Sequence, residues 1–224
     1  MNLNLIIKVL LGLVFCLQLQ AQNAKNSLNR GEVPSKFKFL YDESRQYIGS
    51  ISFSYQMPTS YGDNFIGDAY KGKDGFGFDA NLFVFKNLYI GLNYGIKNFD
   101  IIDNQSVGNY NNTQIEERYI TIGYEFLPVS KIRLGIYTSV IGKATLSNDL
   151  NRDSGNFWCY GLRLEYEFIK NLNIMVAYNW RQVKTDIRVP RELQSYFEKG
   201  TFNVLSFGVK FTFGKYDFVD AIVL

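Results

Sequence analysis

The feature that most constrains this chain is an alternation of apolar and polar residues in eight separate stretches. They cover residues 47–57, 76–85, 88–99, 115–126, 131–141, 156–168, 172–183 and 202–213. A period of two places successive side chains on opposite faces of a β-strand. Each stretch is about as long as the 9–11 residues that a tilted strand needs to cross a membrane.

The connections between these stretches alternate in length. Short turns at 86–87, 127–130 and 169–171 alternate with long connections, rich in Gly, Asn and Asp, at 58–75, 100–114, 142–155 and 184–201. Outer-membrane barrels have short turns at one end, long loops at the other and an even number of strands. The rhythm therefore predicts an all-β fold, an eight-stranded antiparallel up-and-down transmembrane β-barrel over residues 47–213.

The sixth stretch indicates which face of the barrel meets lipid. One face carries Trp158, Tyr160, Leu162, Leu164, Tyr166 and Phe168, and the other carries Cys159, Gly161, Arg163, Glu165 and Glu167. Aromatic girdles on both sides of an aliphatic band are typical of a lipid-facing surface. The apolar face is predicted to contact lipid, and the stretch 88–96 to follow the same rule, with Leu92 in lipid and Asn93 inside.

The interior of an eight-stranded barrel is narrow enough to be filled by side chains. The predicted polar network inside consists of Asp79, Glu125, Lys131, Arg133, Arg163, Glu165, Glu167, Arg181 and Lys210, with Asn81, Asn93 and Lys97 as further candidates. Both signs of charge occur, so we expect ion pairs across the interior, because a buried unpaired charge is very costly. A structural polar plug is the simpler interpretation, and a proton or ion pathway is the alternative.

The absence of histidine limits the chemistry that the chain can perform. It excludes Ser-His-Asp and Cys-His catalytic sites and any metal site that contains histidine. Glu165 and Glu167 share a face, but neighbouring arginines give them a structural explanation. We expect a non-enzymatic protein with no catalytic residue, no metal and no cofactor. The net charge of +3 is too small to indicate nucleic-acid binding.

The N-terminal residues predict export. Lys8 precedes an apolar run over 9–17, and Ala21 follows at the position of a cleavage site. Residues 1–21 are therefore predicted to be a cleaved signal peptide and 22–46 a periplasmic segment, whose Phe37 and Phe39 either dock on the barrel mouth or contact a partner. Residues 214–224 are predicted to form a C-terminal tail.

The last stretch carries a motif that is shared with a known family. Residues 206–213 read SFGVKFTF, in which Ser206, Gly208, Phe211 and Phe213 match an assembly signal of one polar residue, one glycine and two aromatic residues. The chain resembles the small eight-stranded outer-membrane β-barrel proteins of the OmpA-barrel or Opa-like kind. The segment 85–95 and the Ala-Gln at 21–22 are similar to Bacteroidota-type members. The resemblance implies insertion into outer-membrane lipid by the barrel-assembly machinery, and it implies no reaction.

A short helix is predicted at 190–199, with Pro190 at its first turn and Gly200 after its end. Leu193, Tyr196 and Phe197 would share one face, which either folds over the outer loops or contacts a protein partner.

Three classes of function fit these observations. The first is a non-enzymatic outer-membrane barrel that acts in envelope integrity, in surface binding or as an accessory subunit of an outer-membrane or secretion complex. Its protein partner would contact the periplasmic ends or the outer loops. The second is a narrow pore for small solutes. The third is a soluble periplasmic barrel with a ligand inside, which would invert the two faces.

Overall fold

The computed structural model describes residues 39–40, 42–108, 112–148, 151–187, 189–215 and 217–218. The predicted signal peptide, most of the segment before the barrel and most of the C-terminal tail lie outside these residues. Within them, no helix is long and apolar enough to span a membrane.

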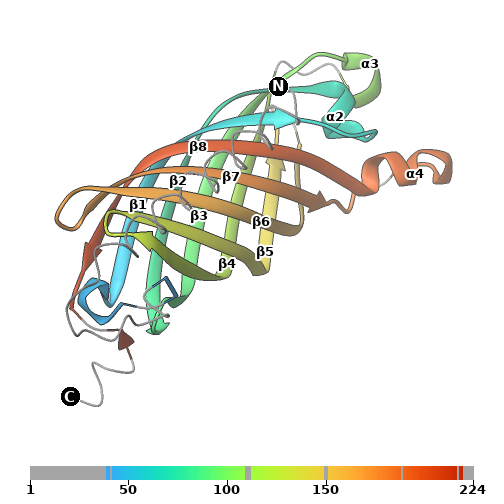
Figure 1. Cartoon of the computed structure of the whole chain (residues 1–224). Coiled ribbons are helices and arrows are strands. Elements are labelled where there is room, and N and C mark those ends of the chain that lie inside the picture. The colour runs from blue at the N-terminus through green and yellow to red at the C-terminus, as the bar shows by residue number, and fades with distance from the viewer. Residues whose placement is uncertain are drawn as a thin grey trace, which may run out of the picture. The chain divides into compact units, whose positions relative to one another are not determined.

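Eight antiparallel strands form a closed barrel (Figure 1). In chain order the elements are η1 (Glu43–Arg45), β1 (Gly49–Ser60), α2 (Phe65–Ala69), β2 (Tyr70–Phe85), β3 (Leu88–Ile101), α3 (Asn104–Val107), β4 (Asn112–Val129), β5 (Ile132–Ser147), β6 (Arg152–Ile169), β7 (Leu172–Lys184), α4 (Arg191–Glu198) and β8 (Lys199–Phe213). Each strand pairs with its neighbours in sequence, and β8 pairs with β1. Closure leaves no unpaired edge, which would cost several kcal/mol per backbone group in hydrocarbon. The predicted fold class is confirmed.

The two ends of the barrel have different connections. Figure 1 shows α2, α3 and α4 at one end, which we call the loop end. The hairpins that follow β2, β4 and β6 lie at the opposite end, which we call the turn end. In the turn after β6, Asn171 has a φ of 66°, a left-handed conformation that Asn adopts more readily than most residues.

The strands are longer at the loop end than the sequence predicts. β5 and β6 remain paired as far as Ser147 and Arg152, so most of the connection expected at 142–155 is strand. From Thr138 to Lys143, β5 advances five residues while β6 advances four. Such a bulge shifts the alternation by one residue. This shift is why the apolar pattern of the fifth stretch breaks near residue 141.

The predicted faces of the barrel are confirmed. On β6, 52% of Trp158 and 61% of Phe168 are exposed on the outside, and 5% of Arg163 is exposed on the inside. On β3, 61% of Leu92 is exposed but only 8% of Asn93. The outer surface is therefore an apolar band with aromatic side chains at its borders, as expected of a barrel that spans a membrane.

The interior is not polar throughout, which corrects the prediction of a wholly polar plug. Near the loop end, the inward side chains form an apolar cluster that includes Phe99, Ile115, Phe157, Val183, Phe202 and Val204. Helix α2 adds Phe65 and Ile66, which are 1% and 0% exposed. Burial of this apolar surface is favourable, so the first long loop folds back into the barrel. We call this cluster the apolar plug.

Candidate functional site

Lys210 on β8 is the centre of the first charged cluster in the interior. Its fully buried Nζ donates to Oε1 of Glu125 at 2.5 Å and to both carboxylate oxygens of Glu165 at 2.9 Å. It also donates to the hydroxyl of Tyr47 at 2.9 Å. That hydroxyl donates in turn to Oε2 of Glu125 at 2.5 Å. The lysine thus compensates two carboxylates that would be costly to bury alone.

Two arginines extend this cluster across the interior. Nη1 of Arg133 lies 3.5 Å from Oε2 of Glu125. Arg163 lies 3.5 Å from Asp79 and 3.8 Å from Glu165. The structure thereby brings six predicted residues together in what we call the turn-side network: Asp79, Glu125, Arg133, Arg163, Glu165 and Lys210.

A second charged cluster, the loop-side triad, lies beside the apolar plug, where Arg181 on β7 is paired with Cys159 and Phe202 of that cluster. The carboxylate of Glu117 accepts hydrogen bonds from Lys97 and from Arg181, and all three side chains are at most 1% exposed. Arg181 and Lys97 were expected in the interior, but Glu117 was missed. The signal was present in the sequence, because Glu117 shares the inward face of β4 with Glu125.

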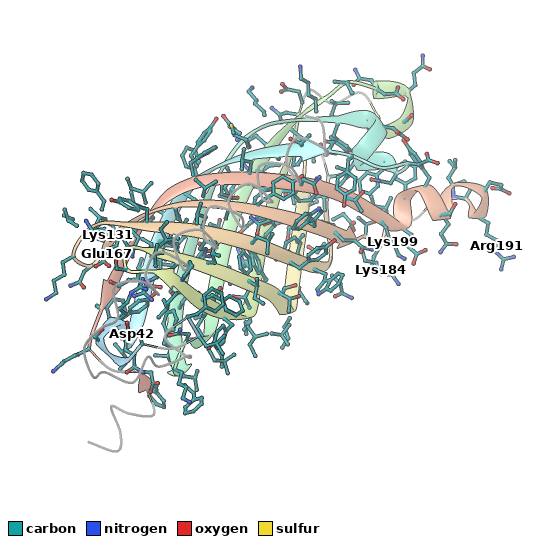
Figure 2. The ribbon with its side chains drawn as sticks, viewed as in Figure 1. Asp42, Lys131, Glu167, Lys184, Arg191 and Lys199 are labelled. Carbon is teal, nitrogen blue, oxygen red and sulfur yellow. The ribbon has the colours of Figure 1, made fainter. Side chains whose placement is uncertain are left out.

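Two predicted members of the network lie outside it. Figure 2 shows Lys131 and Glu167 together at the turn end, where the backbone N–H of Glu167 donates to the carbonyl of Lys131 at 2.8 Å. Lys131 is exposed and Glu167 half-buried. Their assignment to the interior network is wrong, because both stand at the rim of the barrel, where water reaches their charges.

The two clusters hold their charges in fixed pairs. Each carboxylate of the two clusters lies within ion-pair distance of a lysine or an arginine, so none of them is placed as a free base. The thiol of Cys159 is buried within the apolar plug. In the described part of the chain, no three His, Cys, Asp or Glu side chains are grouped to hold a metal ion. This arrangement fills the interior with paired charges and apolar side chains.

The residues before β1 fold against the turn end. The backbone N–H of Leu127 donates to the carbonyl of Phe39 at 2.7 Å, and the ring of Phe39 lies 5.5 Å from that of Phe126. Nη1 of Arg45 donates to the carbonyl of Val129 at 2.9 Å. The predicted docking of Phe39 on the barrel is confirmed, and it occurs at the turn end. Phe37 lies outside the described residues.

The four residues of the predicted assembly signal occupy both faces of β8. Phe211 and Phe213 are each 48% exposed on the lipid-facing side, whereas Ser206 is 2% exposed on the inside. Gly208 also faces inward, where an added Cβ would lie 2.2 Å from the carbonyl oxygen of Phe53. The close approach of β1 therefore requires glycine at this position.

An open cavity of about 420 Å³ lies at the loop end, above the apolar plug. Its apolar wall consists of Phe65, Tyr70, Val107, Leu146, Ile187 and Phe197, and its polar wall of Thr113, Asn148, Asn151, Arg152, Asp153 and Asp186. The connections and strand ends that follow β1, β3, β5 and β7 all contribute to it. We call it the mouth cavity. The sequence analysis did not predict it.

Helix α4 forms part of this mouth, and the short helix predicted at 190–199 is confirmed. The ring of Phe197 stacks on that of Phe65 at 5.5 Å, and Tyr196 also packs against the apolar plug. Only Leu193 keeps an exposed apolar side chain, at 48%. The sequence analysis left two alternatives for the apolar face of this helix, folding over the outer loops or contact with a protein partner. The structure places Tyr196 and Phe197 of this face against the barrel itself.

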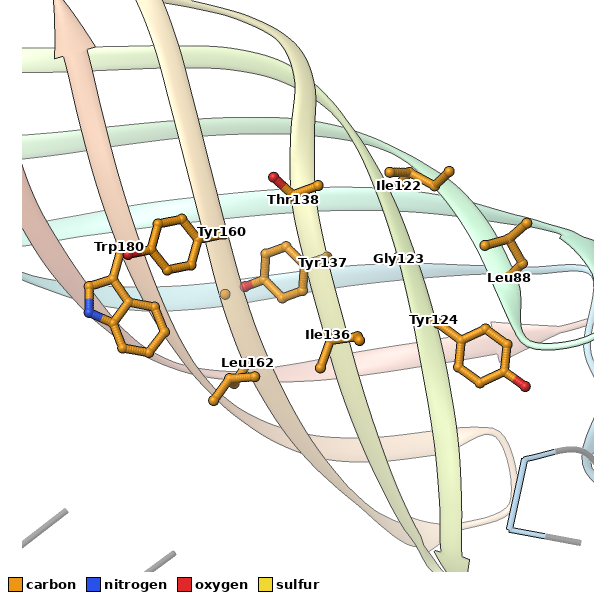
Figure 3. A pocket seen from close by; sticks show the side chains of 11 residues that line it. Leu88, Ile122, Gly123, Tyr124, Ile136, Tyr137, Thr138, Tyr160, Leu162 and Trp180 are labelled. Atoms are coloured by element: carbon orange, nitrogen blue, oxygen red, sulfur yellow. The ribbon is translucent and has the colours of Figure 1, made fainter. Parts of the chain in front are cut away.

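A second concave region, of about 600 Å³, lies on the outer wall of the barrel (Figure 3). Apolar side chains such as Ile122, Ile136, Leu162 and Trp180 line it, and they come from four neighbouring strands. Because it lies within the apolar band, hydrocarbon chains of the membrane fill it. It is part of the lipid-facing surface.

Neither a family model nor a curated protein sequence matches this chain. Solved structures do. Neisserial surface protein A is 14% identical with a TM-score of 0.49, over 74% of this chain and 96% of that one. Ail of Yersinia pestis is 17% identical with a TM-score of 0.48, over 74% and 97%. OprG of Pseudomonas aeruginosa is 11% identical with a TM-score of 0.48, over 77% and 99%.

The fold is that of a small outer-membrane β-barrel. The closed ring and the exposed apolar band establish it. The exposed apolar band agrees with the outer-membrane location expected from the sequence. An outer-membrane protease of Escherichia coli is 11% identical with a TM-score of 0.34, over 75% of this chain and 94% of that one. The Bacteroidota-type resemblance stays a prediction.

Proposed function

We propose that this protein is a non-conducting, non-enzymatic outer-membrane barrel that acts by binding at the cell surface through its loop end. The observation that carries this proposal is the filling of the interior by three groups of side chains. These groups are the turn-side network, the loop-side triad and the apolar plug, and a central side chain of each is buried: Lys210, Glu117 and Ile66 are each 0% exposed.

The structure of the first loop supports a role for the loop end. The side-chain oxygen of Asn64 caps α2 by accepting from the N–H groups of Ile66 and Gly67 at 3.1 Å. Its amide nitrogen donates to the hydroxyl of Thr201 on β8 at 2.8 Å. The loop is thus tied to β8, the strand that pairs with β1, and it holds one wall of the mouth cavity in place. A preformed concave surface is suited to binding.

The non-enzymatic part of the proposal rests on side-chain chemistry. The chain has no histidine, and the buried carboxylates are engaged with lysines and arginines. General acid–base catalysis requires a group that can exchange a proton with a bound substrate. The paired carboxylates inside this barrel lack the access to do so.

The same proposal includes how the barrel is inserted into the membrane. The lipid-facing Phe211 and Phe213 and the inward Gly208 form the pattern that the barrel-assembly machinery is expected to bind. With this assembly, the turn end lies in the periplasm and the mouth cavity faces outward.

A second candidate is an accessory role in an outer-membrane or secretion complex. It is favoured by the segment that covers the turn end, because Phe39 and Leu40 there remain 48% and 40% exposed. These side chains offer an apolar contact to a periplasmic partner.

Planar-bilayer recording of the purified barrel tests the main proposal, with a general porin as the positive control. We expect no unitary conductance from this protein at voltages at which the porin conducts. Regular channel openings would contradict a filled interior and favour the narrow pore. Co-purification of a stoichiometric partner that is lost when residues 22–46 are deleted would favour the accessory role.

A further inference from the structure

We propose that the mouth cavity binds a small organic cation, with an ammonium group at its polar wall and an apolar body against its aromatic wall. This inference rests on the proposed function and specifies the class of ligand that the loop end takes. The volume of about 420 Å³ is within the range of small-molecule sites.

Two oxygen atoms in the polar wall are buried without a hydrogen-bond partner among the described residues. They are Oγ1 of Thr113 and Oδ2 of Asp153. The side chain of Thr113 is only 3% exposed. Buried polar atoms are nearly always hydrogen-bonded, so each such atom requires an explanation. A carboxylate oxygen can only accept, so the missing partner of Asp153 must be a donor.

The strand register places these two atoms on the same side of the mouth. Leu146 on β5 is paired with Ile115 on β4 and with Asp153 on β6. Thr113 lies two residues before Ile115 and therefore on the same inward face. The hydroxyl and the carboxylate thus flank the apolar floor at Leu146, where one ligand can contact all three.

The charges around the cavity favour a cation over an anion. Asp153 and Asp186 both line it. Arg152, the one cation among the described residues of its wall, lies 3.6 Å from Glu116 outside the cavity, which offsets its charge. A metal ion is disfavoured, because no group of three ligating side chains occurs in the described residues.

The opposite wall suits the rest of such a ligand. Phe65, Tyr70 and Phe197 line it, and Phe65 is positioned by its stacking on Phe197 and by an edge contact to Tyr70 at 6.0 Å. Aromatic faces attract cations and also bury apolar groups. An ammonium ion on an apolar body satisfies both walls at once.

The test is a titration of the full barrel in lipid nanodiscs with 2-phenylethylammonium, followed by calorimetry and corrected with empty nanodiscs. The uncharged 2-phenylethanol and the anionic 3-phenylpropionate are probes of the same shape. We expect the cation to bind about tenfold more tightly than the alcohol, and the anion to be weakest, because a hydrogen bond to a charged group contributes most.

Two variants and one control locate the site. Asp153→Asn should weaken binding of the cation about tenfold, and Thr113→Val about threefold. The control is Asp63→Asn, which is the same substitution as in Asp153→Asn but at an exposed carboxylate outside the cavity. It should leave the affinity for the cation unchanged. A gel shift on heating verifies that each barrel is folded.

Equal affinity for the three probes, equal effects of Asp153→Asn and Asp63→Asn, or no binding of the cation would each overturn this inference. None of these results would bear on whether the interior is filled. Channel openings in the bilayer, by contrast, would overturn the proposed function itself, so the two failures are distinguishable.

Discussion

The two halves of the barrel interior are closed by different chemistry. Towards the turn end, closure depends on ion pairs between side chains fixed on strands, such as Lys210 with Glu125 and Glu165. At the loop end it depends on apolar side chains, and part of them, Phe65 and Ile66, comes from a helix in a loop. The first kind of closure is built into the barrel wall, and the second is added to it.

The stability of the fold and the adaptability of its binding surface therefore reside in different parts of the barrel. Removal of one partner from a buried ion pair leaves an uncompensated charge inside the barrel, so the whole fold is affected. Loss of an apolar contact between a loop and the wall affects the loop first, because local openings have lower free energies than global unfolding. The loop end can therefore vary its binding surface while the ring stays intact.

The largest effect is expected from Lys210→Met, which leaves Glu125 and Glu165 without their shared cation. We expect a loss of about 3–5 kcal/mol in the free energy of unfolding, measured by urea titration in lipid vesicles. Lys184→Met is the matched control. Lys184 forms an exposed pair with Glu198 at 3.2 Å, and its loss should change stability by about 1 kcal/mol or less. Equal losses would refute the distinction between strand-borne and exposed pairs.

A smaller effect is expected in the loop-side triad, where two adjacent residues provide the comparison. Glu117→Gln retains a hydrogen-bond acceptor but removes the charge between Lys97 and Arg181, and should destabilise the barrel by about 2–3 kcal/mol. Glu116→Gln, one residue earlier, weakens a pair with the mostly exposed Arg118 and should change stability by about 1 kcal/mol or less. Urea midpoints of the two variants check this. A larger loss for Glu116→Gln would show that burial does not decide the effect.

Ile66→Ala tests the apolar plug. The buried side chain is lost from α2, and we expect about 2 kcal/mol less protection of the α2 amides in hydrogen exchange, with little change in the global urea midpoint. Ile102→Ala is the control, because 61% of that side chain is exposed. A large drop in the global midpoint for Ile66→Ala would mean that the plug is part of the same cooperative unit as the ring.

The smallest effect is expected from Asn64→Ala, which removes the cap of α2. N-cap substitutions cost about 1 kcal/mol, and here the loss should again be confined to exchange of the α2 amides. Asp63→Ala, at the exposed neighbouring residue, should leave that exchange unchanged. If both variants behaved alike, the cap would not hold the plug.

The sequence predicted the barrel because a membrane imposes a strict period of two on every strand. Arg163 and Glu165 could be placed inside from the apolar Leu162 and Leu164 alone. Glu117 was equally predictable, because it lies within the stretch 115–126 and shares the inward face with Glu125. Lys131 was misplaced because alternation gives the face of a residue and not its distance from the rim.

The loop end could not be predicted in the same way. Phe65 and Ile66 lie in a polar connection with no period, so nothing local shows that they turn inward. The mouth cavity combines Thr113, Asp153 and Phe197 from separate parts of the chain. Their proximity follows from the closed ring and the strand register, which exist only after folding.

Ion pairs and apolar side chains close the barrel interior separately. The most direct test of this closure is the conductance of Ile66→Ala in a planar bilayer, compared with that of the unchanged protein. We predict that both are silent, because the turn-side network and the loop-side triad still fill the interior when the apolar plug is weakened. Steady unitary openings of Ile66→Ala, or of the unchanged protein, would contradict the account and show that the strand-borne ion pairs do not close the barrel.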